Sequence, residues 1–228
     1  MYTSAKLLSV AAVLGLAITT SASKIIIKNQ CDYDLQLGKL DNGQSHAEFS
    51  QLAQGSSKDF DVGSQWQGRF WGRESAGSND DSIPGAGTFQ ASLAEFTLRG
   101  HAGYDFYDIS FVDGYNLPIS IEPSNPEKED TNSKYRCGSP TCSKLPTCPE
   151  YLKVYQNGKE VGCKSACSKF NTDEYCCAGD NSTPDKCPPS SYSKDVKDAC
   201  PDVYTYAYDD ITSTYMCKAE GYTVTFCP

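Results

Sequence analysis

Histidine is scarce in this sequence, and the common catalytic motifs are missing. Its two histidines, His46 and His101, belong to no H-E-x-x-H pattern, and no G-x-S-x-G elbow, P-loop or dinucleotide fingerprint occurs. A Ser-His-Asp triad could form only by assembly from distant segments. We therefore expect no nucleotide, no other cofactor and no metal.

Long hydrophobic runs are absent beyond the N-terminus. Leu7–Ile18 is an apolar run of 12 residues that follows the positive charge of Lys6. It is shorter than the ~20 residues of a membrane-spanning helix and is typical of a signal peptide. Cleavage after Ala22, or one residue later, would remove residues 1–22 and leave a chain that starts near Ser23. We expect a secreted protein, extracellular or in the cell wall, without a membrane anchor.

Cysteine is absent between Cys31 and Cys137, although the sequence contains 12 cysteines. Ten of them lie between Cys137 and Cys217, and the last is Cys227. An even number in an exported chain indicates six disulfides rather than metal or redox sites. Spacing alone leaves roughly ten thousand pairings open. The first half must be held together mainly by its core, whereas disulfides hold the loop-rich stretch 137–200.

Positive charge is in the minority. Lys and Arg number 20 against 29 for Asp and Glu, so the net charge is −9. Removal of residues 1–22 takes away Lys6 and no acid, which leaves about −10. Such a surface repels nucleic acid and anionic lipid headgroups, and we expect neither as a partner. A neutral polysaccharide is not repelled.

Strand patterns dominate and helical patterns are scarce. Short β-branched or alternating segments separated by turns predict a β-sandwich or barrel, with strands at 24–28, 34–40, 58–62, 68–72, 89–98, 104–112, 213–216 and 222–226. Residues 73–91 are predicted to form a loop. Short helices are predicted at 164–170 and 190–199, the second with Ser190 or Ser191 as its N-cap.

Five motifs in a fixed order resemble the thaumatin-like protein family, which includes osmotin and related pathogenesis-related defence proteins. They are LAEFTL at 93–98, YDFYDISFVDGYNLPI at 104–119, EYCC at 174–177, CPDVYTYAYDDITSTYMC at 200–217 and YTVTFCP at 222–228. The resemblance spans about residues 24–228. It implies a monomer with a mainly β fold, in which a β-sandwich carries a second domain rich in disulfides, loops and short helices. We place the sandwich at 23–137 and 200–228, and the disulfide-rich domain at 138–199.

The resemblance also selects one disulfide pairing. It implies the pairs Cys31–Cys227, Cys137–Cys217, Cys142–Cys200, Cys148–Cys163, Cys167–Cys176 and Cys177–Cys187. Larger members of the family carry two further disulfides in a small loop domain before the LAEF segment, and this sequence has none there. We therefore expect a reduced loop region at 73–91, which would alter one wall of the family's cleft.

Acidic residues are the remaining candidates for chemistry. The family places one arginine and several acids around a cleft between its two domains, and by motif these positions fall on Arg69, Glu95, Asp108, Asp113 and one of the pair Asp209 and Asp210. Two carboxyl groups that flank a sugar bond can hydrolyse it, so Glu95, Asp108 and Asp113 are the candidate catalytic residues. Asp108 and Asp113 are five residues apart and would face opposite sides of a straight strand. A bulge or turn must reorient one of them.

Aromatic residues surround these acids. Rings stack on the apolar faces of sugars, and the nearby rings are Phe96, Phe106, Tyr107, Phe111 and Tyr115. We expect most of them in the core. Tyr115 follows Asp113-Gly114 in a predicted turn, so it is the ring that we expect to be exposed and to bind substrate.

Three functions are consistent with these features. The first is binding of cell-wall polysaccharide, β-1,3-glucan, in a defence, antifungal or wall-associated role. The second is weak endo-β-1,3-glucanase activity that uses Glu95 and an aspartate. The third is a protein–protein role, as an inhibitor of a hydrolase or as a secreted effector. Asn181-Ser182-Thr183 is in addition an N-glycosylation sequon, with Pro184 directly after it.

Overall fold

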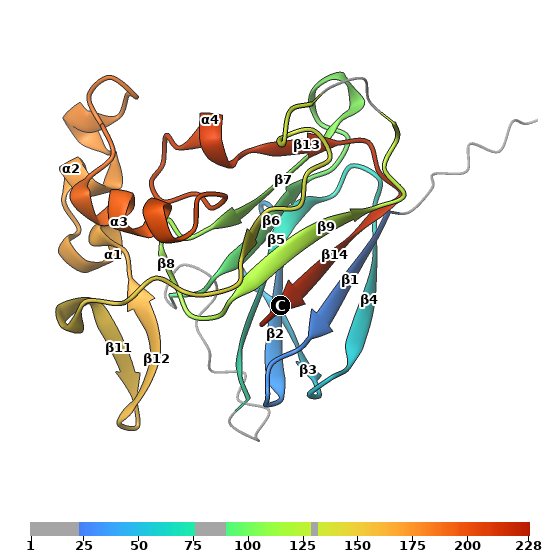
Figure 1. Ribbon diagram of the computed structural model, residues 1–228, viewed down its shortest axis with the longest axis horizontal. Coiled ribbons are helices and arrows are strands. Elements are labelled where there is room, and N and C mark those ends of the chain that lie inside the picture. Colours follow the sequence, from blue (N-terminus) through green and yellow to red (C-terminus); the bar gives the residue numbers. More distant parts are fainter. Residues whose placement is uncertain (1–22, 76–89, 129–131) are drawn as a thin grey trace, which may run out of the picture.

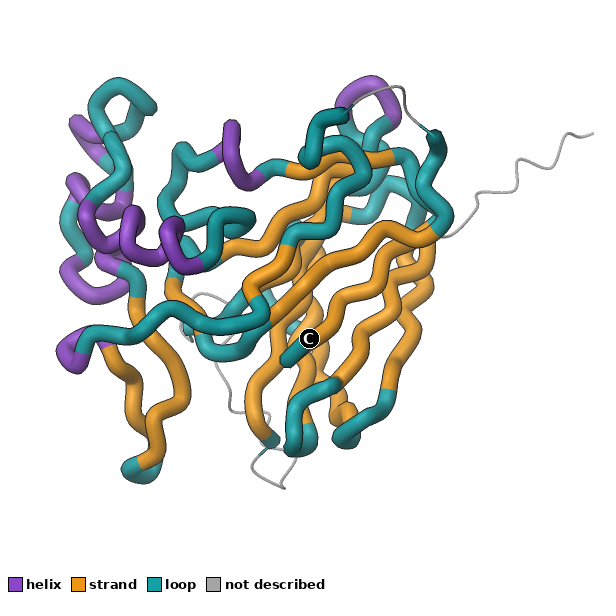
Figure 2. The backbone as a smooth tube through the Cα atoms, in the orientation of Figure 1, coloured by secondary structure: helices purple, strands orange, loops and turns teal. Residues whose placement is uncertain are grey.

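Strands make up most of the regular structure, as the sequence predicts. The computed structural model describes residues 23–75, 90–128 and 132–228, so the predicted signal peptide lies outside the described residues. Two sheets face each other across a common core, and a third small sheet lies beside them together with most of the helices (Figure 1). Figure 2 shows the separation: the strands of the sandwich lie on one side and most of the helices gather on the other. The fold is mainly β.

The first sheet has five strands, and β1 lies inside it. In β1 the apolar Ile25 and Ile27 are fully buried, whereas Lys24 and Lys28 on either side of them are exposed, which is the alternation of a strand with one face on the core. β1 pairs in parallel with β14 and antiparallel with β4. The strand order is β10 (Thr141–Cys142), β9 (Ile119–Ser124), β14 (Gly221–Phe226), β1 (Ser23–Asn29) and β4 (Ser57–Val62).

The second sheet has six strands and supplies the large rings of the core. Phe96 on β6 and Tyr107 on β7 are buried against Tyr222 of the first sheet, with ring centroids 5.3 and 4.8 Å from it. This confirms the prediction that most rings near the acids belong to the core. The order is β13 (Tyr215–Cys217), β7 (Asp105–Ser110), β6 (Leu93–Thr97), β5 (Gln67–Glu74), β2 (Leu35–Asp41) and β3 (Glu48–Leu52).

The third sheet and most helices come from the cysteine-rich part of the chain. The sheet consists of β11 (Lys153–Gln156), β12 (Lys159–Lys164) and β8 (Gly114–Tyr115). The helices are α1 (Ala166–Phe170), α2 (Asp173–Cys176), α3 (Ser191–Ala199) and α4 (Asp210–Ser213), with 3-10 turns η1 (His101–Gly103), η2 (Glu150–Leu152) and η3 (Gly179–Asn181). The predicted helices are α1 and α3. Ser190 caps α3, because its hydroxyl accepts a hydrogen bond from the Ser193 N–H at 3.2 Å.

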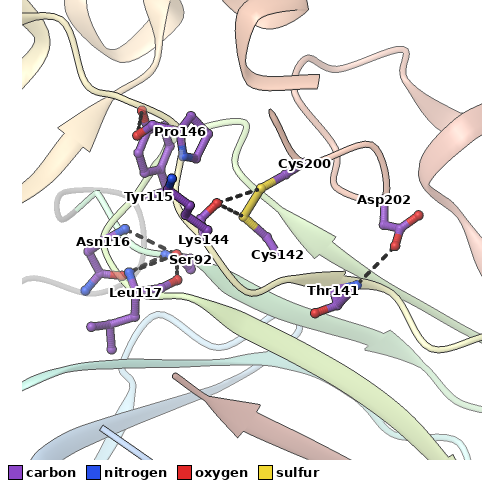
Figure 3. Close-up of a disulfide and its surroundings, with 10 residues drawn as sticks. All are labelled: Ser92, Tyr115, Asn116, Leu117, Thr141, Cys142, Lys144, Pro146, Cys200 and Asp202. Atoms are coloured by element: carbon purple, nitrogen blue, oxygen red, sulfur yellow. Dashed lines mark hydrogen bonds between the residues drawn. A yellow bond between two sulfur atoms is a disulfide. The ribbon is translucent and has the colours of Figure 1, made fainter. Parts of the chain in front are cut away.

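All six predicted disulfides are present, and no described cysteine is free. Cys142–Cys200 shows what they connect: it joins β10 at the edge of the first sheet to the C-cap of α3 (Figure 3). Asp202, two residues beyond, accepts a hydrogen bond from the Thr141 N–H at 3.3 Å. The helical side of the molecule is thereby fixed to the sandwich.

Six strands were not predicted from the sequence: β3, β8, β9, β10, β11 and β12. β9 contains Pro123, which argues against a central strand because proline cannot donate to the sheet. The structure places Pro123 where β9 has only one neighbour, since β10 pairs with Ile119 and Ser120 alone. β11 and β12 lie in the disulfide-rich segment, where loops were expected. Among the described residues no helix is long and apolar enough to cross a membrane.

Candidate functional site

Three charged residues lie side by side on the outer face of the six-stranded sheet. Arg69 on β5 is directly opposite Glu95 on β6, and Glu95 is directly opposite Asp108 on β7. Their neighbours in sequence, Phe70 and Tyr107 among them, point into the core. Strand alternation therefore turns all three charged side chains away from the core, onto one face.

Arg69 and Glu95 form an ion pair. Arg69 Nη1 is 3.6 Å from Glu95 Oε1, and both side chains are about a third exposed. Burial raises the pKa of Glu95, the guanidinium of Arg69 opposes that rise, and the charge of Asp113 adds to it. Arg69 and a hydrogen bond with the Ser110 side chain thus oppose the rise in the pKa of Glu95.

Of the two acids in this row, Asp108 has fewer hydrogen bonds and opposite charges to offset its burial. Its Oδ1 atom is buried, and no residue in the described part of the chain donates a hydrogen bond to it. Burial raises the pKa of Asp108 well above its usual range, and the negative charges of Glu95 and Asp210 raise it further. A neutral Asp108 carboxyl group has a proton to donate to a ligand.

Asp113 reaches the same site through a turn after β7. The Gly114 N–H donates to the Phe111 carbonyl at 3.0 Å, and Gly114 has φ 125°, a conformation that favours glycine. The turn brings Asp113 to the same side of the sheet as Asp108, as the five-residue spacing required. Ser168 of α1 donates to the Asp113 carbonyl at 2.7 Å and holds the turn. Burial raises the pKa of Asp113, and Arg69 opposes the rise.

These residues line two adjoining cavities of about 270 and 410 Å³, which share Arg69, Glu95 and Asp108. We call the combined depression the acidic groove. The smaller cavity is completed by Leu93, Ser110, Val112, Asp113, Tyr204 and Ala207, and the larger by residues 40–44, Gln67, Gly68, Phe96, Thr97 and Phe106. The two cavities extend the groove from the β2–β3 turn across the sheet to the segment before α4.

For this chain, the placement of the cleft between the sandwich and the disulfide-rich domain stays a prediction. None of the described residues that line the two cavities belongs to 138–199. From the segment 203–213 the smaller cavity is lined by Tyr204 and Ala207, and Tyr204 pairs with the end of β7 through a bridge to Ser110. The other expected wall, residues 73–91, lies mostly outside the described residues, which omit 76–89.

Asp209 and Asp210, which the sequence could not separate, have different surroundings. Asp209 is buried, and its carboxylate accepts hydrogen bonds from the Thr205 N–H and hydroxyl and from the Thr212 hydroxyl, so it is committed to the local structure. Asp210 is exposed and accepts a hydrogen bond from the Tyr204 hydroxyl at 2.9 Å. Of the two, Asp210 is the one beside the groove.

Tyr115 does not belong to the acidic groove. It is only 4% exposed, pairs with Cys163 of β12, and its hydroxyl donates to the Pro146 carbonyl at 3.3 Å (Figure 3). The expectation of an exposed substrate-binding ring at this position was wrong, because the chain after Gly114 continues into β8 and is covered by the disulfide-rich segment.

Two other rings border the groove. Phe106 precedes Asp108 by two residues on β7, so it shares the outer face, where it is half-buried. Tyr204 lines the opposite end. The alternation of YDFYDIS separates Phe106 from Tyr107 and could have identified the first as the outer ring. No pattern in the sequence identifies Tyr204 as a residue of the groove.

The sequon residue Asn181 lies in η3, far along the chain from the groove. Its side-chain amide donates to the Lys186 carbonyl at 3.1 Å, and the residue is half-buried. Glycosylation at Asn181 stays a prediction.

Comparison with known proteins supports the resemblance seen in the sequence. The model of the Thaumatin family matches residues 29–228. The chain belongs to the thaumatin family. Among its relatives, pathogenesis-related protein 5 of Arabidopsis thaliana is 40% identical over 229 residues, with 92% of each chain covered. Pathogenesis-related thaumatin-like protein 3.5 of Cryptomeria japonica is 42% identical over 228 residues, which cover 91% of this chain and 90% of the relative.

This member of the thaumatin family also shares its fold with solved structures of low sequence identity. A laminaripentaose-producing β-1,3-glucanase, solved with laminaritetraose, has a TM-score of 0.65 at 10% identity. The match covers 91% of this chain and 99% of the glucanase. At this identity the likeness concerns the fold alone.

Proposed function

We propose that this thaumatin-family protein is a secreted defence protein that binds β-1,3-glucan of cell walls in the acidic groove. The observation that carries the proposal is the row of Arg69, Glu95 and Asp108 on one sheet face, joined by Asp113 from a turn. The named relatives are pathogenesis-related proteins. A β-1,3-glucanase that shares the fold makes this glucan the first ligand to test.

The groove offers the contacts that a neutral sugar needs. The Glu95 carboxyl group can accept hydrogen bonds from sugar hydroxyls, and the buried Asp108 Oδ1, to which no described residue donates a hydrogen bond, leaves a polar atom for the ligand. The half-buried ring of Phe106 offers an apolar surface for a sugar face. Because the ligand carries no charge, high salt should change its affinity little.

The test is laminarin binding by calorimetry, with a Glu95→Gln, Asp108→Asn double variant. We expect its affinity to fall about tenfold or more, since hydrogen bonds of about 0.5–1.5 kcal/mol each, and more at a charged group, are weakened at two positions. Glu122→Gln is the matched control, because Glu122 is an exposed acid on β9 of the other sheet. Equal affinities for the three proteins would refute the groove as the site, and a folded protein without affinity for laminarin would favour a protein target instead.

Hydrolysis of the same glucan is a second candidate. It is favoured by the contrast between Asp108, whose pKa is raised well above its usual range by burial and by neighbouring acids, and Glu95, where the charge of Arg69 opposes the rise in pKa that burial causes. A glycosidase needs one carboxyl group that donates a proton and one that is ionised. Release of reducing ends from laminarin, lost in both Asp108→Asn and Glu95→Gln, would establish the activity. Binding without release would leave the protein a binding module.

The proposal includes export of the protein from the cell by its N-terminal signal peptide. Six disulfides fit an oxidising compartment, and β1 begins at Ser23, directly after the proposed signal peptide. N-terminal sequencing of the protein from culture medium should find a start at Ser23 or Lys24. A medium without the protein, or a start upstream of residue 20, would contradict export by this signal.

A further inference from the structure

A cluster of aromatic side chains lies on the disulfide-rich side of the molecule, outside the acidic groove. Tyr192 of α3 is its centre: its ring centroid is 6.4 Å from that of Tyr151, 5.6 Å from that of Phe170 and 5.7 Å from that of Tyr175. Tyr151 is 52% exposed and Phe170 is 38% exposed. Neighbouring rings stand at steep angles, 78° for Tyr151 and 75° for Tyr175 relative to Tyr192. Tyr175 and Tyr192 also line a cavity, and Tyr151 and Phe170 extend this aromatic rim through their contacts with Tyr192.

A cavity of about 550 Å³ lies beside these rings. That volume is within the ~300–1,000 Å³ of small-molecule sites. Tyr175 and Tyr192 line it from the rim, and Phe111 and Tyr115 line its sandwich side. The acidic groove and this cavity share Val112. The two sites therefore adjoin each other.

The charges around the cavity disfavour an anionic ligand. Asp195 and Asp198 on α3 are exposed carboxylates in its lining, and Lys164 is the one cation among the described lining residues. The exposed Thr147 adds a hydroxyl group. Rings that alternate with carboxylates and hydroxyls match a neutral saccharide, which has apolar faces and many hydroxyl donors.

We infer that this cavity and its aromatic rim are a second saccharide subsite, which binds the continuation of a glucan chain held in the acidic groove. The inference rests on the proposed function for the identity of the ligand. A single long chain that occupies both sites gains affinity, because its second contact is intramolecular. A short oligosaccharide that fills the groove does not.

The test compares laminaritetraose with long-chain laminarin by calorimetry on the full protein. A Tyr151→Ala, Phe170→Ala double variant should bind laminarin about tenfold more weakly and laminaritetraose as the wild type does. Tyr155→Ala is the matched control, since Tyr155 is 51% exposed on β11 but makes no ring contact with the cluster. Circular dichroism and melting temperature check that each variant folds.

The outcomes separate this inference from the proposed function. If the ring variant keeps wild-type affinity for laminarin, or loses affinity for both ligands to the same degree, the subsite is refuted whatever the groove does. If Asp108→Asn has no effect while the ring variant weakens laminarin binding, the groove fails as a glucan site, and the cavity binds glucan on its own and not as the continuation of a chain held in the groove. Laminarin should also protect Tyr151 from nitration more than Tyr155, and equal protection of the two would overturn the inference.

Discussion

Lys197 of α3 is the point at which the helical side of the molecule holds one wall of the acidic groove, so we predict the effect of Lys197→Met. Its ammonium group is 3.1 Å from Asp209 Oδ2 and donates to the Ser213 hydroxyl at 2.7 Å. It also donates to the carbonyls of Val203 and Thr212, at 2.9 and 3.3 Å. All four partners lie in the segment 203–213. Methionine fills similar space and makes none of these contacts.

The expected cost follows from these contacts and from their burial. Removing one partner of a fully buried ion pair costs about 3–5 kcal/mol. The Lys197 side chain is 21% exposed and that of Asp209 9%, and Asp209 keeps its hydrogen bonds from Thr205 and Thr212. We therefore expect the free energy of unfolding to fall by about 2–4 kcal/mol.

Urea denaturation measures this change as a lower midpoint with an unchanged slope. Lys197→Arg keeps a cation at the position and should retain more than half of the lost stability. Because the same segment carries Tyr204 and Asp210, Lys197→Met should also weaken laminarin binding without touching the ligand. A loss of less than about 1 kcal/mol, with full binding, would show that the segment is positioned by something else.

Three further predictions concern other parts of the molecule. Burial and the neighbouring carboxylates raise the pKa of Asp108, so the wild type should lose stability as the pH rises from about 4 through the folded-state pKa. Asp108→Asn should thus be the more stable protein in thermal melts at pH 7 but not at pH 3, and a gap of equal size at both would contradict this. Gly38→Ala should cost about 1–3 kcal/mol in urea, since the new Cβ would lie 2.2 Å from the Trp71 ring, whereas Gly63→Ala meets no atom within 4 Å and serves as control. Loss of the Cys31–Cys227 disulfide, whose cysteines are 196 residues apart, should lower the free energy of unfolding by about 2–5 kcal/mol, and a melting temperature within a degree of the wild type would refute this.

The sequence predicted most strands of the sandwich because their residues alternate. Ile25 and Ile27 lie between Lys24 and Lys28, and this pattern indicates which face of β1 is buried. β9 was missed because Pro123 breaks the expected pattern, and its position beside a short neighbour cannot be seen from local residues. The disulfide pairing came from the family resemblance and not from spacing.

The candidate site was predicted in its residues but not in its surroundings. The row of Arg69, Glu95 and Asp108 depends on the register between three strands, which the resemblance supplied and local sequence does not. The prediction of an exposed Tyr115 was wrong because a turn pattern in the sequence does not show which other segment of the chain will cover that turn. Asp209 and Asp210 are chemically identical, and only their partners, Lys197 and Tyr204, distinguish them.

The parallel pairing of β1 with β14 sets the order in which this protein can be made and folded. β14 lies between β9 and β1, with Ile27 beside Val224 in the middle of the five-stranded sheet. A ribosome must therefore complete residue 226 before the sheet has its central strand. Until then β1 presents an unpaired apolar edge, which chaperones of the secretory compartment can bind. Native oxidation of Cys31, which follows β1 directly, must wait for the same event.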